Sequence, residues 1–453
     1  MKTLQEWQAA DAAHHLHPFT NQADINRKGS RVISHAQGAY IFEANGHRLL
    51  DGMSGLWCCN LGYSQPRINQ AIAAQLEELP YYNTFFQCTH PRATELAQAI
   101  SDKAPAHLNR VFFTNSGSEA NDSVLRLINR YWDARGKPQR KAIIARQNAY
   151  HGSTIGGASL GGMGFMHEQF EPLRGIHHIP QPYWFEASKD VADMDEQSFG
   201  LWAANQLEQK ILTLGPDHVA AFFAEPIQGA GGVIIPPDSY WPRVQEICQQ
   251  YGVLLVVDEV IFGFGRTGEW FASQFYQLEP DFIVFAKGIT NGFVPLGGVL
   301  VSDRVSEALL SHTNDLAHGF TYSGHPVACA AALATLEILA EGHIDKVKNE
   351  LSQAMLDYWL PLADHPLVGQ ARCKGLVGAL ELVKDKSSKQ RFAGNGRAGT
   401  VCRDMSLQAG LVMRATGDTM IIAPPFILDR NEIKDLTERA WQALDLAQAQ
   451  LQQ

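Results

Sequence analysis

Two stretches, VLLVVDEV at residues 253–260 and DFIVFAKG at residues 281–288, decide the predicted fold. Each is a short apolar run that ends in ionisable side chains, with Asp258 in the first and Lys287 in the second. Runs that are apolar throughout are typical of strands buried on both faces of a parallel sheet. Ligands of such sheets bind beyond the carboxyl ends of the strands, so we expect Asp258 and Lys287 to meet at a functional site.

The chain around these stretches alternates predicted strands and helices. Further apolar runs predict strands at residues 111–113, 141–146 and 219–224. Helical spacing predicts helices over 66–79, behind a proline, and over 241–251, before a terminating glycine. The alternation predicts an α/β fold with a mostly parallel central sheet.

Three regions differ in pattern. Residues 1–62 predict an N-terminal segment with a hairpin around Asn45-Gly46, and residues 63–328 predict the large α/β domain. Residues 329–453 predict a smaller C-terminal α+β domain, which the N-terminal segment joins. Its predicted elements are helices at 327–341, 344–363 and 432–451 and strands at 376–383 and 420–428.

Composition excludes several classes of function. The 453 residues are 45% hydrophobic and 19% charged, which is typical of a globular chain. Lys and Arg number 37 against 47 Asp and Glu, a net charge of −10, so neither nucleic acid nor an anionic membrane is an expected partner. The seven cysteines form no CxxC, and no signal peptide or spanning apolar run stands out, so we expect a cytoplasmic protein.

The segment TNSGSEAND at residues 114–122 predicts a turn that opens a helix. Ser116 can cap the helix, and Glu119 three residues later suggests a capping box. The exposed N–H groups of Gly117 and Ser118, together with the helix dipole, suit a phosphate. An ordinary capped helix would explain the same residues.

Asp258 and Lys287 fit one cofactor. A buried aspartate needs a cationic partner, and a partly buried lysine has a lowered pKa that suits a Schiff-base nucleophile, although a salt bridge with Asp258 or Glu225 is the alternative. Pyridoxal 5′-phosphate needs a lysine, an acid at its ring nitrogen and an anion cradle. Tyr150, in NAYHGST at residues 148–154, could supply an aromatic face for the ring.

Other motifs lack the required context. GFGRTG at 263–268 and GNGRAG at 394–399 match the dinucleotide pattern, but neither lies between a strand and a long helix as that site requires. GASLG at 157–161 matches a nucleophile elbow, but no apolar strand precedes Ser159. The 17 histidines are scattered without HExxH, so we predict no metal site.

The chain resembles the class-III pyridoxal-phosphate aminotransferases, in particular the omega-amino acid and polyamine:pyruvate transaminases. The resemblance covers nearly the whole chain and implies a fold-type-I architecture. The motifs that carry it occur in the order of the family: HHLHPF, DGMSGLWC, FFTNSGSEAND, NAYHGST, AEPIQGAGG, VDEVIFGFGRTG, FAKGITNG, GFTYSGHP and MRATGDTMIIAPPF.

The resemblance implies how the cofactor is held. Lys287 would bond to it and shuttle a proton, and Asp258 would pair with its pyridine nitrogen. Tyr150 and Val260 would flank the ring, with Glu225 near the ring oxygen. The phosphate site would comprise Ser116, Gly117, Ser118 and, from the neighbouring subunit, Phe320 and Thr321.

The resemblance also implies the substrate contacts. Arg414 matches a mobile arginine that binds the keto-acid carboxylate and then swings toward solvent or Asp418. Two departures from the family are Phe262, where relatives often have a smaller residue, and Arg372-Cys-Lys-Gly, which we expect to alter a loop. The substrate pocket would be lined by Phe19, Leu56, Trp57, Phe85, Phe86, Tyr150 and Phe262, some of them donated by the partner.

The predicted activity is transfer of an amino group from a terminal amine to pyruvate in two half-reactions. The donor would be putrescine, another polyamine or an omega-amino acid, and the assembly a homodimer or larger with shared active sites. An aminomutase, decarboxylase or racemase would use the same Lys287 and Asp258. An NAD-dependent dehydrogenase and a non-catalytic binding protein would each explain part of the pattern. The exact donor, the stereochemical preference and the choice between dimer and tetramer stay open.

Overall fold

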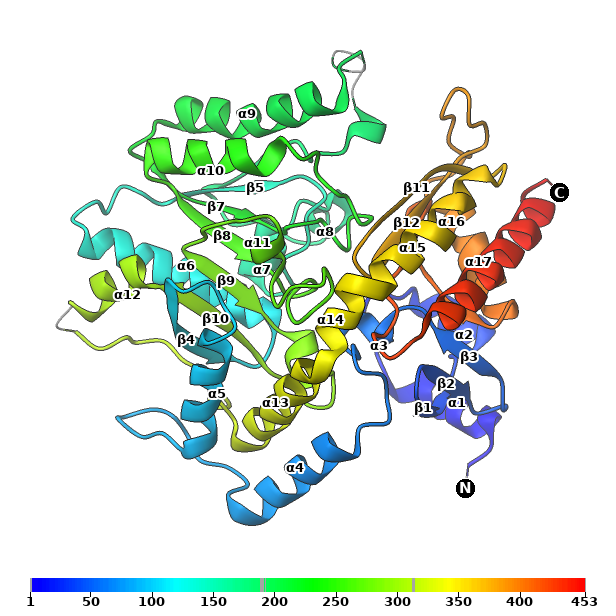
Figure 1. The fold of residues 1–453 in the computed structure, drawn as a ribbon, viewed down its shortest axis with the longest axis horizontal. Coiled ribbons are helices and arrows are strands. Elements are labelled where there is room, and N and C mark those ends of the chain that lie inside the picture. Colours follow the sequence, from blue (N-terminus) through cyan, green and yellow to red (C-terminus); the bar gives the residue numbers. More distant parts are fainter. Residues whose placement is uncertain (1, 188–190, 192, 312–313, 453) are drawn as a thin grey trace.

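The computed structural model describes residues 2–187, 191, 193–311 and 314–452 (Figure 1). The described residues form three sheets. A seven-stranded sheet has the order β4-β10-β9-β8-β7-β5-β6. Two four-stranded sheets have the orders β1-β2-β3-β13 and β11-β12-β15-β14. Figure 1 shows the two smaller sheets together on one side of the large one.

The central sheet confirms the predicted strands and adds two. The predicted strands are β4 (Leu108–Thr114), β5 (Ala142–Arg146), β7 (Val219–Ala224), β8 (Leu254–Asp258) and β9 (Phe282–Phe285). The sequence did not predict the edge strand β6 (Ile176–Ile179) or β10 (Gly297–Ser302), which is antiparallel to both its neighbours. Strands β9, β8, β7, β5 and β6 run parallel, as a mostly parallel sheet requires.

Helices cover both faces of this sheet. Helix α6 (Gly117–Ala134) packs against one face, where Val124 and Ile128 meet Phe223. Helices α9 (Glu196–Leu214) and α10 (Tyr240–Tyr251) cover the other face. Gly252 ends α10 in the left-handed region at φ 60°, as the sequence predicts. The shorter helices are α7 (Ile155–Leu160), α8 (Gly164–His167), α11 (Ala272–Phe275) and α12 (Asp303–Leu310).

A long helical stretch links the large sheet to the C-terminal part. It begins with α13 (Pro326–Ile338), which packs on α4 (Pro66–Glu78) and α5 (Pro91–Ser101), and continues through α14 (Ile344–Lys346) and α15 (Ser352–Tyr358). By length and composition Pro326–Asp364 could span a membrane, but 61% of its most apolar window is buried inside the structure. That burial is what a core helix shows.

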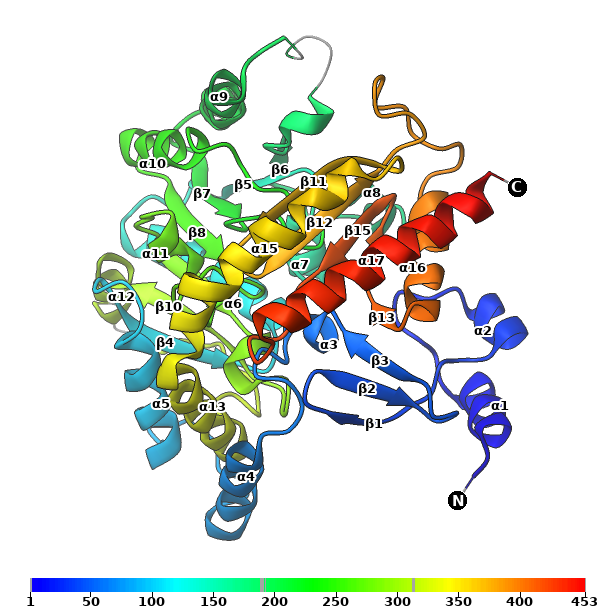
Figure 2. The ribbon, with the colours of Figure 1, turned by 45° about the vertical axis from the view of Figure 1, so that its right-hand side comes forward.

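The N-terminal strands pair with the C-terminal part. The predicted hairpin is confirmed as β2 (Tyr40–Glu43) and β3 (Arg48–Asp51), and β3 pairs in parallel with β13 (Leu411–Val412). The predicted strand 420–428 stops at Ile422, because Pro424 and Pro425 have no N–H to donate. The remaining elements are α1 (Leu4–His14), α2 (Gln22–Lys28), β1 (Ile33–Gln37), α3 (Ser54–Trp57), β11 (Val368–Lys374), β12 (Val377–Leu382), α16 (Arg397–Gln408), β14 (Arg414–Thr416), β15 (Thr419–Ile422) and α17 (Arg430–Leu451). Figure 2 shows α15 and α17 lying across the β11–β12–β15 sheet.

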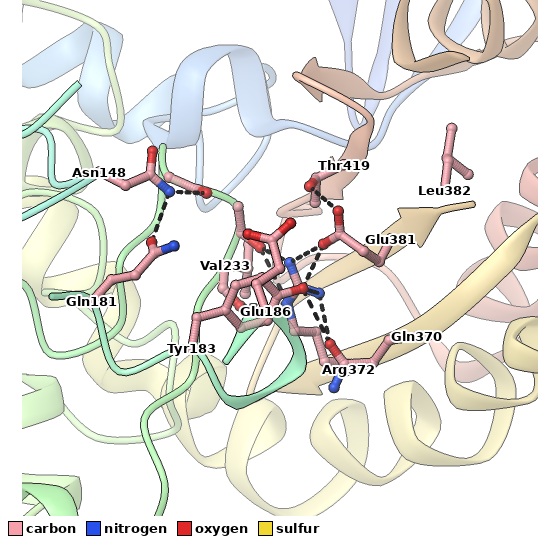
Figure 3. Close-up of polar contacts among 12 residues, drawn as sticks. Asn148, Gln181, Tyr183, Glu186, Val233, Gln370, Arg372, Glu381, Leu382 and Thr419 are labelled. Atoms are coloured by element: carbon pink, nitrogen blue, oxygen red, sulfur yellow. Dashed lines mark hydrogen bonds and ion pairs between the residues drawn. The ribbon is translucent and has the colours of Figure 1, made fainter. Parts of the chain in front are cut away.

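A buried polar network joins the β11–β12 sheet to loops of the central sheet (Figure 3). Glu381 is 1% exposed, pairs with Arg391 and with Arg372 at 3.0 Å, and accepts a hydrogen bond from Tyr183 at 2.6 Å. Arg372 also donates to the carbonyl of Val233 at 2.9 Å. Arg372 therefore lies in strand β11 and not in the altered loop that the sequence suggested.

Glu381→Ala should destabilise the protein by about 3–5 kcal/mol, because it leaves the buried Arg372 without its carboxylate. Urea unfolding at pH 7 measures the change. Glu186→Ala removes the exposed partner of Arg391 and should cost less than about 1 kcal/mol. Equal losses in the two variants would contradict the role given to the buried pair.

The same carboxylate predicts a dependence on pH. Burial alone would raise the pKa of Glu381, but Arg372 and Arg391 outweigh burial and hold the pKa below its usual value. Its stabilisation is therefore present above the unfolded value of about 4.3 and is lost as the pH falls through the lower, folded value. The difference in unfolding free energy between the wild type and Glu381→Ala should shrink below a pH of about 4.3.

Candidate active site

A cavity of about 350 Å³ opens at the carboxyl ends of β7 and β8. It brings together eight of the residues that the sequence singles out: Ser116, Gly117, Ser118, Tyr150, Glu225, Asp258, Val260 and Lys287. Asn115, in the turn that the sequence also singles out, lines the cavity as well. Sequence reasoning did not assign a site role to the other lining residues: Cys58, Asn121, His151, Gly152, Ile261, Ala286, Thr290, Gly292, Val294, Pro295 and Leu296.

Asp258 is the last residue of β8 and is 4% exposed. Its Oδ2 accepts a hydrogen bond from Asn121 Nδ2 at 2.8 Å and lies 2.8 Å from His151 Nδ1. Its Oδ1 accepts one from the N–H of Val260 at 3.1 Å. These contacts fix the carboxylate in one orientation. Asn121 and His151 lie within the motifs SEAND and NAYHGST, but neither motif shows that the two side chains meet Asp258.

Lys287 lies just beyond β9 in a strained conformation. Its φ is 50°, in the left-handed region that costs a non-glycine residue about 1–3 kcal/mol and is concentrated at functional sites. Burial lowers the pKa of its amine, although Cys58, Asp258 and Glu225 partly oppose the shift. In the described part of the chain Lys287 forms no ion pair within 4.0 Å, so the salt-bridge alternative receives no support. Lys287 thus lines the cavity with an amine whose pKa lies below its usual value.

The turn between β4 and α6 forms an anion cradle. Ser116 caps α6 by accepting a hydrogen bond from the N–H of Glu119 at 3.2 Å. The predicted capping box is wrong by one residue, because the Glu119 carboxylate accepts from the N–H of Asn115 at 2.7 Å and not from that of Ser116. Ser116, Gly117 and Ser118 line the cavity, so the positive end of the α6 dipole lies at its wall.

Glycines keep this cradle open. A Cβ on Gly117 would lie 2.7 Å from Val260, which is too close for real atoms. A Cβ on Gly152 would lie 2.7 Å from the Cα of Ser118, and the φ of Gly152 is 119°. The space between α6 and the Gly152 loop thus depends on two residues without side chains.

Glu225, just after β7, anchors the Tyr150 loop. Its carboxylate accepts from the N–H of Tyr150 at 3.1 Å and from that of Gly229 at 2.8 Å. Burial raises the pKa of Glu225, and the charge of Asp258 raises it further. Arg146, which ends β5, is fully buried and donates to the Glu225 carbonyl. No pattern in the sequence indicates that Arg146 is buried here.

Trp57 lies between two cationic side chains. Its ring centre is 5.3 Å from Lys287 Nζ and 4.9 Å from the guanidinium carbon of Arg414. Burial lowers the pKa of Arg414. The expected partner Asp418 is instead buried and accepts from the N–H of Gly399 at 2.9 Å. Arg414 therefore packs on Trp57, near the cavity lysine.

Other expected pocket residues do not line this cavity. Phe85 and Phe86 line a separate hollow, and Phe86 is 90% exposed. The Thr321 carbonyl accepts from Tyr81 Oη at 2.8 Å, next to Phe320. Phe262 is fully buried in an apolar cluster. The two remaining side chains are Leu56, which is half exposed, and Phe19, whose ring lies edge-on to Tyr150 at 6.3 Å.

The dinucleotide-like loop GFGRTG has a structural role. It follows β8 without opening a long helix, as the sequence predicts. Its Arg266 is fully buried, donates to Asn60 Oδ1 at 2.6 Å and to the carbonyl of Pro424 at 3.2 Å, and burial lowers its pKa to about 10. The loop thus connects the central sheet to the segment after β15.

Comparison with known proteins identifies the class. The family model "Aminotransferase class-III" matches residues 23–444. The chain is 53% identical over 443 residues to a putrescine–pyruvate aminotransferase of Pseudomonas aeruginosa, covering 97% of this chain and 96% of that protein. It is 41% identical over 428 residues to a vanillin aminotransferase of Capsicum chinense, covering 93% and 92%.

Solved structures agree with this class. An omega transaminase from Pseudomonas jessenii in complex with PMP superposes with a TM-score of 0.96 at 37% identity, covering 98% of this chain and 99% of that one. An (S)-enantioselective omega transaminase from Thermomicrobium roseum superposes with a TM-score of 0.95 at 39% sequence identity, covering 99% of each chain. The chain belongs to the class-III aminotransferases. It is an enzyme with the α/β architecture of fold-type-I transferases.

Gly152→Ala should close the cradle, because the added Cβ meets the Ser118 backbone and because a φ of 119° is unfavourable for alanine. We expect loss of most cofactor binding with a stability cost of about 1–3 kcal/mol. Absorbance of the reconstituted protein and thermal unfolding measure the two effects. Gly164→Ala, where an added Cβ meets nothing, is the control. Normal cofactor retention in Gly152→Ala would contradict the cradle.

Proposed function

We propose that this aminotransferase uses pyridoxal 5′-phosphate to move an amino group from a terminal amine to pyruvate. The products are an aldehyde or semialdehyde and alanine. The donor would be putrescine, another polyamine or an omega-amino acid. The observation that carries the proposal is the cavity that holds Lys287, Asp258 and the α6 cradle together. The 53% identity to a putrescine–pyruvate aminotransferase supports the substrate class.

The residues present fit this cofactor. The cradle of Ser116, Gly117 and Ser118 suits a phosphate, and a Cβ at Gly117 would fill part of it. Asp258 is a buried acid that suits a protonated ring nitrogen, and Lys287 offers an amine for the aldehyde. When bound, the cofactor supplies an electron sink for the negative charge that develops at the substrate carbon. Tyr150 and Val260 would flank its ring.

The side chains of the chain perform the remaining steps. Lys287, whose pKa burial lowers, would accept the proton from the substrate carbon that bears the amine and deliver it to the cofactor carbon on the other side of that nitrogen. Asp258, held by Asn121 and His151, would keep the ring nitrogen protonated. Arg414 would bind the carboxylate of pyruvate with two parallel hydrogen bonds and move aside for a donor without one.

A second copy of the chain would complete the site. Phe85, Phe86, Phe320 and Thr321 lie away from the cavity of their own chain. Large apolar side chains are exposed around them, including Tyr81, Phe86 and Tyr322. Exposed apolar patches mark interaction sites, so these residues support a homodimer or larger assembly in which each subunit completes the active site of the other.

The proposed enzyme has two domains and acts on small molecules. The large domain would comprise residues 63–328 and the small domain residues 329–453. The N-terminal segment, residues 1–62, would join the small domain through the β3–β13 pair. We place the enzyme in the cytoplasm because its seven cysteines form no CxxC and no disulfide framework. The net charge of −10 supports small-molecule partners and neither nucleic acid nor an anionic membrane. A panel of amines with pyruvate, read out as alanine, tests the activity. Turnover without nitrogen transfer would instead indicate an aminomutase, decarboxylase or racemase.

Lys287→Ala should keep its fold but lose transamination by several orders of magnitude, because one group holds the cofactor and moves the proton. Single-turnover absorbance with a diamine measures the loss, and thermal unfolding checks the fold. Lys348→Ala, at an exposed lysine paired with Glu269, is the control. Near-normal turnover in Lys287→Ala would refute the assignment.

Arg414→Ala should weaken the pyruvate half-reaction by about 1.5–3 kcal/mol, the value of a charged hydrogen-bonded pair. The half-reaction with a diamine that carries no carboxylate should change little. The cofactor absorbance follows each half separately. Arg403→Ala, at an exposed arginine of α16, controls for a general change in charge. Equal losses in both halves would mean that Arg414 supports the fold or the cofactor.

A further inference from the structure

The side chains of Asp11, His15 and His17 meet at the end of α1. His15 Nδ1 lies 3.1 Å from one carboxylate oxygen of Asp11, and His17 Nε2 lies 2.8 Å from the other. One ligand atom from each residue lies within 4.8 Å of the other two. We propose that these three residues bind a divalent transition-metal ion of the Zn²⁺ type.

The ligand chemistry and geometry suit such an ion. Two imidazole nitrogens and one carboxylate oxygen are ligands that Zn²⁺ prefers, at bond lengths of about 2.0–2.2 Å. Tetrahedral ligands at these lengths lie about 3.3 Å apart, so each observed pair needs a shift of about 1.5 Å or less. The His15 side chain is 60% exposed, which leaves the fourth position open to water. The ion would replace the direct contacts that the two histidines now make with Asp11.

The backbone holds the three ligands in place. Asp11 lies in the last turn of α1, and the N–H of His15 donates to the Asp11 carbonyl at 2.9 Å. Gln8 of the same helix donates to the carbonyl of Ser30 at 2.9 Å, which ties α1 to the segment after α2. The hydroxyl of Ser30 is buried and has no hydrogen-bond partner among the described residues. The side chains of Asp11, His15 and His17 therefore lose little further conformational freedom when they bind one ion.

The position of the site gives the ion a role. Pro18 and Phe19 follow His17 directly, and Phe19 is held in the left-handed region at φ 50° with its ring against Tyr150. Figure 2 shows α1 and α2 at the periphery, beside the β1–β2–β3 sheet. An ion on His17 would restrict the segment that places Phe19 next to the cavity wall. The site would therefore stabilise the segment that places Phe19 against Tyr150, and it would take no part in the chemistry.

Calorimetric titration of Zn²⁺ into holoenzyme stripped of metal by a chelator tests the site. We expect one ion per chain in the wild type, and affinity lower by at least about 10- to 100-fold in His15→Ala and His17→Ala. Asp11→Asn should show the same loss while keeping the shape of the side chain. His14→Ala removes the adjacent exposed imidazole and is the matched control, which should bind as the wild type does.

Hydrogen exchange over residues 4–19 gives a readout independent of activity. Zn²⁺ should slow exchange there in the wild type and in His14→Ala, and not in the three ligand variants. The proposal is overturned if the wild type binds no Zn²⁺, or if the ligand variants bind as well as the wild type. An equal loss in His14→Ala would also overturn it, because it would indicate unspecific binding to surface histidines.

Discussion

The buried carboxylate of Asp258 is the constraint on which the active site depends. Removing a charge from water is costly unless hydrogen bonds and a counter-charge compensate for it. Asn121, His151 and the N–H of Val260 supply the hydrogen bonds, but the described part of the chain places no lysine or arginine within 4.0 Å of this carboxylate. A ring nitrogen that stays protonated beside Asp258 would provide the missing charge. Under the proposed function, this uncompensated carboxylate would select a cofactor that carries a protonated ring nitrogen.

The parallel sheet brings the other parts to the same edge. β7, β8 and β9 are paired in parallel, so Glu225, Asp258 and Lys287 emerge at neighbouring carboxyl ends. The N-terminus of α6 faces the same edge and adds its dipole. The strain at Lys287 is tolerated because the buried strand β9 on one side and the buried residues 288–291 on the other fix the backbone. The pairing of the strands thus determines which side chains meet at the active site.

Local patterns predicted what depends on local sequence, and missed what depends on the folded chain. Apolar runs located β7, β8 and β9, and the residues at their ends located Glu225, Asp258 and Lys287. The contacts of His151 and Asn121 with Asp258 join segments 107 and 137 residues apart, and no spacing encodes such pairs. The Asp11–His15 spacing marks one helix face, but His17 joins that pair only through the turn after α1.

The arrangement around Trp57 connects Arg414, the proposed binding residue for the keto-acid carboxylate, to the basicity of Lys287. Arg414 and Lys287 both lie within 5.3 Å of the centre of its ring, and the charge of Arg414 helps to lower the pKa of Lys287. A carboxylate bound to Arg414 would cancel much of that charge, so it would raise the basicity of Lys287. A diamine brings no such anion, so Lys287 would stay less basic for as long as Arg414 remains against Trp57. Under the proposed function, the site would therefore respond differently to its two kinds of substrate without a change of fold, because the charge of Arg414 acts directly on Lys287.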